Sequence, residues 1–152
     1  MPTEYTGTGG STPYLDALAG LPAEVAIGWT GPSVVNDRIT ADDARRRRDA
    51  LGGRAPLLWD NWPVNDAVMA DRLFLGPFRG RDPGLADVCA GYLANPMVQP
   101  GANALPLASV AAFLQGEDPV VAWEAEADRR GLRVLAEACD GTVPAALVAE
   151  VV

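Results

Sequence analysis

The stretch 59–66, WDNWPVND, constrains this chain more than any other. It follows a short apolar run, 56–58, that predicts a buried strand ending at Trp59. Carboxylates and amides beside a buried strand need polar partners, whereas a solvent-facing loop does not need tryptophan. Polar groups next to aromatic side chains at a strand end are typical of a ligand pocket. The alternative is a strand cap, in which Asp60 and Asn61 bond nearby backbone N–H groups.

The same residues suit a sugar as the ligand. Two tryptophans, Trp59 and Trp62, stand among two aspartates and two asparagines in this stretch. Carboxylate and amide oxygens accept hydrogen bonds from hydroxyl groups, and an indole face can cover the apolar face of a sugar ring. We therefore expect a carbohydrate site at this strand end.

Composition limits the class of protein. With 152 residues, 49% hydrophobic and 21% charged, the chain is long enough for one domain with a core. Its net charge of −8 argues against a nucleic-acid surface, and no apolar run reaches the roughly 20 residues that cross a bilayer. The chain opens with neither a basic nor an apolar segment, so we expect a cytoplasmic protein as the sequence is written. A longer parent with a signal peptide would be secreted, which leaves the location open.

Two missing residue types limit the chemistry. The sequence contains no histidine, and all 12 of its basic residues are arginine. Ser-His-Asp and Cys-His catalysis, lysine Schiff bases and histidine metal sites are therefore excluded. Cys89 and Cys139 are too few for a zinc cluster and are interpreted as buried thiols. We expect no metal ion and no cofactor, and any catalysis to use carboxylates, tyrosine and amides.

The order of the sequence patterns predicts an α/β fold. Strands are expected over 25–30, 56–59 and 104–107, and helices over 13–20, 40–53, 84–94, 119–130 and from 107 to about 114. Alternating strands and helices form parallel sheets, whose ligand sites lie at the carboxyl ends of the strands. Tyr5 and residues 30–32, 59–66 and 95–96 fall at such ends, so we expect them to meet on one face.

The helix over 40–53 has the clearest local signals. Thr40 and Asp43 have the spacing of a capping box, and Gly52 and Gly53 follow the last turn. These signals predict where the helix begins and ends.

The charges of this helix are interpreted as structural. Asp42 with Arg46, and Asp43 with Arg47, are spaced for i, i+4 ion pairs on an exposed face. The arginine run 45–48 is therefore expected to be a solvated helix face. The two adjacent aspartates stand in the first turn, where the helix dipole favours acids, and are not expected to be catalytic.

Five blocks of sequence, in this order, resemble one known family. They are PTEY at 2–5, WTGPSVV at 29–35, WDNWPVND at 59–66, LFLGPFRGR at 73–81 and NPM at 95–97. Together they are similar to the catalytic barrel of glycoside hydrolase family 84, the β-N-acetylglucosaminidases that include O-GlcNAc hydrolases and enzymes once called hyaluronidases. The resemblance covers most of residues 2–125.

The resemblance implies a (β/α)8 TIM barrel, of which this chain carries part. Such barrels need at least about 200 residues, more than the 152 present. We expect residues 1–130 to be the C-terminal half of the barrel, about strands 5–8. Residues 131–152 are expected to be a helical tail or the start of a following domain.

The resemblance also implies a mechanism. The family hydrolyses terminal β-linked N-acetylglucosamine with retention, and the sugar's own 2-acetamido oxygen forms an oxazoline. Two adjacent aspartates at the end of the fourth strand orient the acetamido group and supply the acid and base. The only adjacent aspartates in this sequence, Asp42 and Asp43, are expected to start a helix. We therefore expect no catalytic residue in this chain, and an inactive isolated chain, because acid–base catalysis is typically worth about 10²–10⁴-fold.

The sugar-binding residues of the family are carried over by resemblance. Asp66 matches the aspartate that accepts hydrogen bonds from the 4- and 6-hydroxyls, and Asn95 matches its partner. The alternative for Asp66 is a loop cap. Arg79 and Arg81 are expected to brace the loop rather than to touch sugar.

Four further residues match the acetamido pocket. Asn61 matches an asparagine near the acetamido group, and Tyr5 matches the tyrosine that closes on it. Trp59 matches a wall of the pocket, and Val35 lines the leaving-group side. The alternative for Tyr5 and Val35 is ordinary packing.

A half-barrel would leave unpaired strand edges, which a barrel avoids only by closing. Three arrangements follow: a longer enzyme, association with a chain that supplies the missing N-terminal half-barrel, or a homodimer. The expected ligand is a glycan or glycoprotein that contains N-acetylglucosamine, with no nucleic acid and no membrane. The alternative function is a non-catalytic remnant that binds N-acetylglucosamine or stabilises a partner.

Overall fold

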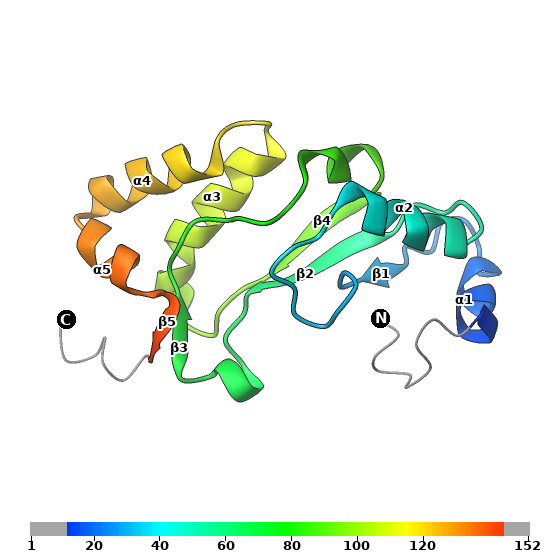
Figure 1. Cartoon of the computed structure of the whole chain (residues 1–152), viewed down its shortest axis with the longest axis horizontal. Coiled ribbons are helices and arrows are strands. Elements are labelled where there is room, and N and C mark those ends of the chain that lie inside the picture. The colour runs from blue at the N-terminus through cyan, green and yellow to red at the C-terminus, as the bar shows by residue number, and fades with distance from the viewer. Residues whose placement is uncertain (1–11, 145–152) are drawn as a thin grey trace. The chain divides into compact units, whose positions relative to one another are not determined.

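The structure is a computed structural model and describes residues 12–144. Its elements are α1 (Thr12–Ala19), β1 (Gly28–Trp29), α2 (Ala41–Ala50), β2 (Leu57–Pro63), η2 (Ala67–Met69), β3 (Arg72–Phe74), η3 (Pro83–Asp87), β4 (Gly91–Asn95), η4 (Pro100–Asn103), α3 (Ala104–Leu114), α4 (Pro119–Arg130), α5 (Arg133–Ala138) and β5 (Asp140–Pro144), where η is a 3₁₀ helix (Figure 1). The chain divides into two compact units. The first holds the residues up to Asn61 together with 80–94, and the second holds 62–79 together with those from Asn95 onward.

A parallel sheet organises the first unit. Its strand order is β1-β2-β4, and β1 runs parallel to β2 with Gly28 opposite Leu57 and Trp29 opposite Leu58. Apolar side chains of β1, β2, α2 and η3 form one buried cluster, which consists of Trp29, Ile39, Ala41, Ala44, Leu58, Leu85 and Val88. The mixed α/β fold with a parallel sheet is therefore confirmed.

The start and end of α2 agree with the sequence prediction. The Thr40 hydroxyl accepts a hydrogen bond from Asp43 N at 3.1 Å, and the Asp43 carboxylate accepts one from Thr40 N at 2.8 Å, which completes the capping box. Gly52 and Gly53 follow the helix with φ angles of 66° and 90°. Glycine adopts this left-handed region without steric cost, so the helix ends there.

The ion pairs of α2 differ from the expected ones. Arg45 pairs with Asp42, and Arg46 pairs with Asp43, both at i, i+3. The expected i, i+4 pairs are wrong because Asp43 turns back onto the helix start and takes Arg46 as its cation. Arg47 is consequently left without Asp43, and it is half-buried rather than solvated.

Helices and a short ribbon form the second unit. α3 packs against α4, and β3 pairs antiparallel with β5 (Figure 1). Trp123 of α4 is buried and donates its indole N–H to the Leu75 carbonyl at 2.5 Å. The core of this unit consists of Leu75, Met97, Leu105, Trp123, Ala127, Ala136 and Cys139. Cys139 is a free buried thiol, as expected.

Three predicted elements need correction. The expected helix over 84–94 is wrong, because η3 ends at Asp87 and β4 follows beside β2. A Cβ at Gly91 would lie 3.1 Å from Leu57 Cδ1, so this glycine allows the close approach of the two strands. The expected strand over 104–107 is wrong, because α3 begins there and its first turn tolerates Pro106. The strand expected over 56–59 continues to Pro63. No helix in the described part of the chain is long and apolar enough to cross a membrane.

Candidate carbohydrate site

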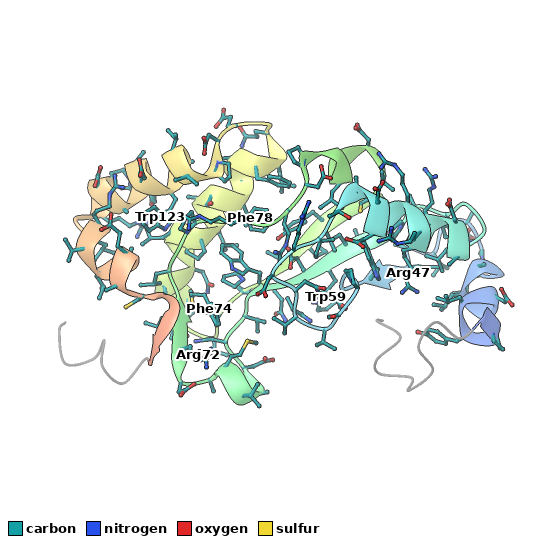
Figure 2. All side chains as sticks on the ribbon, in the orientation of Figure 1. Arg47, Trp59, Arg72, Phe74, Phe78 and Trp123 are labelled. Carbon is teal, nitrogen blue, oxygen red and sulfur yellow. The ribbon has the colours of Figure 1, made fainter. Side chains whose placement is uncertain are left out.

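β2 carries the candidate site on one of its two faces. Alternate residues of a strand point to opposite faces of the sheet. Leu58 and Asp60, each 1% exposed, face the buried cluster of the first unit. Trp59, labelled in Figure 2, is 47% exposed. By the same alternation it lies on the other face, together with Asn61. Most of WDNWPVND is therefore extended strand. Its residues alternate between a buried face that packs in the core and a face that is partly exposed.

Asp60 is held in a buried ion pair. Arg81 donates Nε–H to one Asp60 carboxylate oxygen at 2.7 Å and Nη2–H to the other at 2.8 Å. Both side chains are almost fully buried, at 3% and 1% exposure for Arg81 and Asp60. A planar guanidinium that binds a carboxylate at two points fixes its direction as well as its charge. The Asp60 carboxylate is thus occupied, and the expectation that Arg81 braces this region is confirmed.

Tyr92 of β4 completes this buried group. Its hydroxyl donates to Asp60 Oδ2 at 3.1 Å. Burial raises the pKa of Tyr92 far above its usual value, and the negative charge of Asp60 raises it further. The phenol therefore stays protonated and remains a donor. Since Asp60 bonds side chains of Arg81 and Tyr92, the alternative in which it caps the strand through backbone N–H groups is wrong for this residue.

The loop that carries Val35 is fixed beside β2. Asn61 donates its side-chain amide to the Val34 carbonyl at 2.8 Å. Asn36 closes the loop on itself, since it accepts from Ser33 N at 2.8 Å and donates to Thr30 O at 2.8 Å. These contacts bring Val35, which is 49% exposed, into the neighbourhood of Asn61.

A close approach explains the glycine in this loop. Gly31 has a φ of 101°, and a Cβ there would lie 2.6 Å from Asn36 Nδ2. Only glycine fits both conditions. Sequence reasoning did not single out Asn36, although asparagine is one of the residues whose side chain commonly closes a turn.

Asn65 holds the end of WDNWPVND in the second unit. It is fully buried, and its amide donates to the Arg72 carbonyl and to Gln99 Oε1, both at 2.8 Å. Its oxygen accepts from Val98 N at 3.0 Å. Asn65 was also missed as a positioning residue, because only the fold brings the segment after Asn95 next to it.

Asp66 follows Asn65 and is exposed. It stands at the N-terminal end of η2 but makes no capping hydrogen bond. Among residues 12–144 its carboxylate has no hydrogen bond or ion pair, so the alternative of a loop cap is wrong. The next residue, Ala67, has a φ of 47°, which costs energy for a residue with a Cβ. A carboxylate without a structural partner on a strained turn is consistent with a ligand site.

The two tryptophans of the stretch have different environments. The ring of Trp62 lies 5.0 Å from that of Phe78, and Phe78 in turn packs against Phe113 at 5.0 Å. Trp62 is therefore part of the packing of the second unit. Trp59, by contrast, is half-exposed.

A family model described as β-N-acetylglucosaminidase matches residues 1–139. The chain belongs to this family. The resemblance to glycoside hydrolase family 84 is thereby confirmed, and with it the classification among hydrolases and glycosidases.

Several relatives of the chain are O-GlcNAc hydrolases by name. The protein O-GlcNAcases of Rattus norvegicus and Mus musculus are each 35% identical to it over 119 residues, which is 74% of this chain and 13% of theirs. A solved mutant of the Thermobaculum terrenum O-GlcNAc hydrolase is 36% identical with a TM-score of 0.72. That match covers 77% of this chain and 26% of the solved chain. The chain thus spans a small part of the relatives that it matches, and its fold is similar to part of a TIM barrel.

The expected site residues fall in both units of the chain. Val35, Trp59 and Asn61 belong to the first unit, and Asp66 and Asn95 belong to the second. Asn95 is half-buried at the end of β4. Tyr5 lies outside the described residues.

The segment after Asn95 is fixed in the second unit. Asn103 accepts from Met97 N at 2.8 Å and donates to Met97 O at 2.9 Å. Asn103 also donates to Gln99 O at 3.1 Å. Two buried asparagines, Asn65 and Asn103, therefore hold the backbone of 97–99.

The adjacent aspartates of the chain are structural. Asp43 is part of the capping box of α2, and Asp42 pairs with Arg45 in the same helix. Burial alone would raise the pKa of Asp43, but hydrogen bonds from Thr40 and the charge of Arg46 lower it. Within residues 12–144 no group of three or more histidine, cysteine or acidic side chains could hold a metal ion.

Proposed function

We propose that this chain supplies the sugar-binding side of a retaining β-N-acetylglucosaminidase that acts on terminal β-linked N-acetylglucosamine. The observation that carries the proposal is the difference between the two faces of β2. Asp60 is neutralised in a buried ion pair, while Trp59 and Asn61 lie on the opposite face of the same strand. A half-exposed indole beside a side-chain amide offers an apolar face and a polar group together, which suits a sugar ring.

The individual roles follow from the family. Asp66 accepts hydrogen bonds from the 4- and 6-hydroxyls of the sugar, with Asn95 as its partner. A carboxylate that makes no bond to its own loop is free for this task. Trp59 covers one side of the acetamido group, Asn61 lies near that group, and Val35 lines the leaving-group side. Tyr5 closes on the acetamido group.

Catalysis in this proposal proceeds by substrate assistance. The acetamido oxygen attacks the anomeric carbon and gives an oxazoline, and an aspartate pair supplies the acid and base. The adjacent aspartates of this chain belong to α2 and are engaged there. The acid pair is therefore contributed by the rest of a barrel, and residues 1–152 alone are inactive.

The proposed architecture is a barrel to which residues 1–130 contribute about strands 5–8. Residues 131–152 then form its tail or lead into a further domain. Leu93, an apolar side chain that is 45% exposed on the sheet of the first unit, is consistent with a face that other strands cover. That cover is supplied by a continuous longer chain, by a separate half-barrel or by a second copy.

Binding of a thiazoline analogue of the oxazoline to the chain 1–152, followed by calorimetry, tests the proposal. We expect a Kd on the order of micromolar for the chain and a loss of about tenfold or more in Asp66→Ala, because a hydrogen bond to a charged group is worth about 1.5–3 kcal/mol. The exposed Asp87 of η3 offers a matched control, and Asp87→Ala should bind as the parent does.

Three outcomes separate the alternatives. Hydrolysis of an aryl N-acetylglucosaminide by the isolated chain would overturn the assignment of the acid pair to another part of the barrel. Binding without activity, even after the missing half-barrel is added, would favour a non-catalytic N-acetylglucosamine-binding module. A well-folded chain that does not bind the thiazoline would contradict a preformed sugar-binding side.

A further inference from the structure

Side-chain amides in the second unit join the two segments that carry Asp66 and Asn95. Asn65, the residue before Asp66, is fully buried. Its side-chain amide donates to the Gln99 side-chain oxygen at 2.8 Å, and its own oxygen accepts from Val98 N at 3.0 Å. Asn65 is therefore bonded to the segment that follows Asn95 both through a side chain and through the backbone.

The hydrogen bonds of Asn65 use both of its donors. A primary amide has two N–H groups. The Asn65 amide donates to the Gln99 side chain and to the Arg72 carbonyl, each at 2.8 Å, and Arg72 of β3 is labelled in Figure 2. An apolar side chain of similar size would fill the same space without needing partners. A buried amide whose donors are all bonded instead selects one arrangement of the segments around it.

The segment that Asn65 contacts is itself fixed to the core of the second unit. Met97 is 3% exposed and belongs to that core. Asn103 accepts from Met97 N at 2.8 Å, and it donates to Gln99 O at 3.1 Å. The backbone of 97–99 is thus held by the core and by Asn103, and Asn65 is held by that backbone.

Asp66 and Asn95 are each a short stretch of backbone away from these contacts. Asp66 directly follows Asn65, and Asn95 precedes Val98 by three residues, a span of at most about 11 Å. The backbone of Asp66 is extended, with φ −101° and ψ −179°, so its side chain points away from that of Asn65. One side chain is accordingly buried while the next is exposed. The contacts of Asn65 therefore limit how far Asp66 can move relative to Asn95.

We propose that Asn65 is a positioning residue that fixes Asp66 relative to Asn95 and thereby sets the preference for N-acetylglucosamine over its C4 epimer, N-acetylgalactosamine. This inference rests on the proposed function, in which Asp66 accepts from the 4- and 6-hydroxyls with Asn95 as its partner. The epimer keeps the 6-hydroxyl but points the 4-hydroxyl in another direction. A pair of groups held at fixed positions can bond both hydroxyls of one epimer only. Asn65 is buried and acts through its neighbours rather than on the sugar.

Calorimetric titration of chain 1–152 with two thiazolines tests this role. One thiazoline has the configuration of N-acetylglucosamine, and the other is its C4 epimer. The parent should bind the first about tenfold or more tightly, because the epimer loses a hydrogen bond to a charged group. Asn65→Ala should weaken binding of the first about tenfold and change binding of the epimer little, so the ratio of the two dissociation constants falls toward one.

Variants of Gln99 test the same role with a smaller change to the core. Gln99→Met removes the acceptor of one Asn65 N–H and leaves the bonds of Asn65 to Arg72 O and Val98 N in place. It should lower the ratio in the same direction, and it decides the question if Asn65→Ala does not fold. Gln99→Glu keeps an acceptor oxygen and should retain the parental ratio.

Gln115→Met is the matched control. It makes the same change at the exposed C-terminal end of α3, which also belongs to the second unit. Both dissociation constants should equal those of the parent. Urea unfolding of every variant measures its stability separately from its selectivity.

The outcomes distinguish this inference from the function on which it rests. A selective parent whose ratio is unchanged in the Asn65 and Gln99→Met variants would overturn the role of Asn65 and leave the proposed function standing. Equal weakening of both thiazolines would do the same, because a residue that only stabilises the fold would give that result. A parent that binds both epimers equally would also overturn it. A folded parent that binds neither would contradict the proposed function itself, and this inference with it.

Discussion

At the scale of single residues, the buried ion pair of Asp60 with Arg81 is expected to stabilise the fold around β2. Asp60→Asn leaves a buried guanidinium without its counter-charge. Breaking a buried pair in this way costs about 3–5 kcal/mol, so we expect a fall of this size in the free energy of unfolding, measured with urea. Tyr92→Phe removes one hydrogen bond to the same carboxylate and should cost only about 1 kcal/mol.

The control for this experiment is Asp87→Asn, which changes the same atoms at an exposed position. It should leave the urea midpoint within about 0.5 kcal/mol of the parent. Equal small effects of Asp60→Asn and Asp87→Asn would mean that the Asp60–Arg81 pair does not hold β2.

Residue types in WDNWPVND could be read from the sequence, but their directions could not. The apolar run before Trp59 and the mixture of acids, amides and indoles predicted a strand end with a site. Which acid is buried depends on Arg81 and Tyr92, which are remote in the sequence and reach Asp60 only through the fold. Trp62 and Trp59 are likewise the same residue type, and the sequence does not show that Trp62 packs against Phe78 while Trp59 is half-exposed.

At the scale of elements, α2 offers a direct test of its capping box. Thr40→Ala removes the hydroxyl that accepts from Asp43 N, and the loss of such a cap costs about 1 kcal/mol of stability. Thr40→Ser keeps the hydroxyl and should retain most of that stability. Thermal unfolding followed by circular dichroism measures both variants, and an equal loss in the two would show that the methyl group matters rather than the cap.

The end of α4 should respond to acid. Hydrogen bonds from Arg129, and then from Arg130, lower the pKa of Glu126 from 4.5 to about 2. A lowered carboxyl pKa means that these ion pairs favour the folded state above about pH 4.5, and that this contribution is lost as the pH falls toward 2. Carbon-13 NMR of the Glu126 carboxyl should therefore give a midpoint near 2.

Variants of the neighbouring arginines decide the cause of this shift. Arg129→Gln should raise the Glu126 midpoint. Arg133 pairs with Asp128 instead, so Arg133→Gln should leave the Glu126 midpoint unchanged. A midpoint that does not move in Arg129→Gln would contradict the role of that hydrogen bond.

Elements with local signals were predictable, and elements that depend on distant partners were not. The capping box and the two glycines of α2 are encoded within the helix itself. β4 is a strand because β2 lies beside it, and nothing within 84–94 reveals that neighbour. The start of α3 resembled a strand, since a short apolar run does not distinguish the two without its context.

At the scale of the whole molecule, one face of the β1-β2-β4 sheet carries two exposed apolar side chains, Trp59 and Leu93. A Cβ at Gly91 would point toward Leu57, so Gly91 and Leu57 share a face. Alternation then puts Leu93 on the same face as Trp59. In a TIM barrel this face would be covered, and strand pairing would continue beyond β1.

The last prediction concerns self-association through this face. Chain 1–152 should associate reversibly, because covering Leu93 and Trp59 removes apolar surface from water. Leu93→Glu should raise the dissociation constant about tenfold or more, since full burial of a leucine is worth about 1.5–3 kcal/mol. Val121→Glu is the matched control: Val121 is 61% exposed on α4, outside the sheet, so this variant should associate as the parent does. Sedimentation velocity over a concentration series measures all three proteins. A monomer at every concentration, or equal effects of the two glutamates, would mean that this sheet face does not drive association.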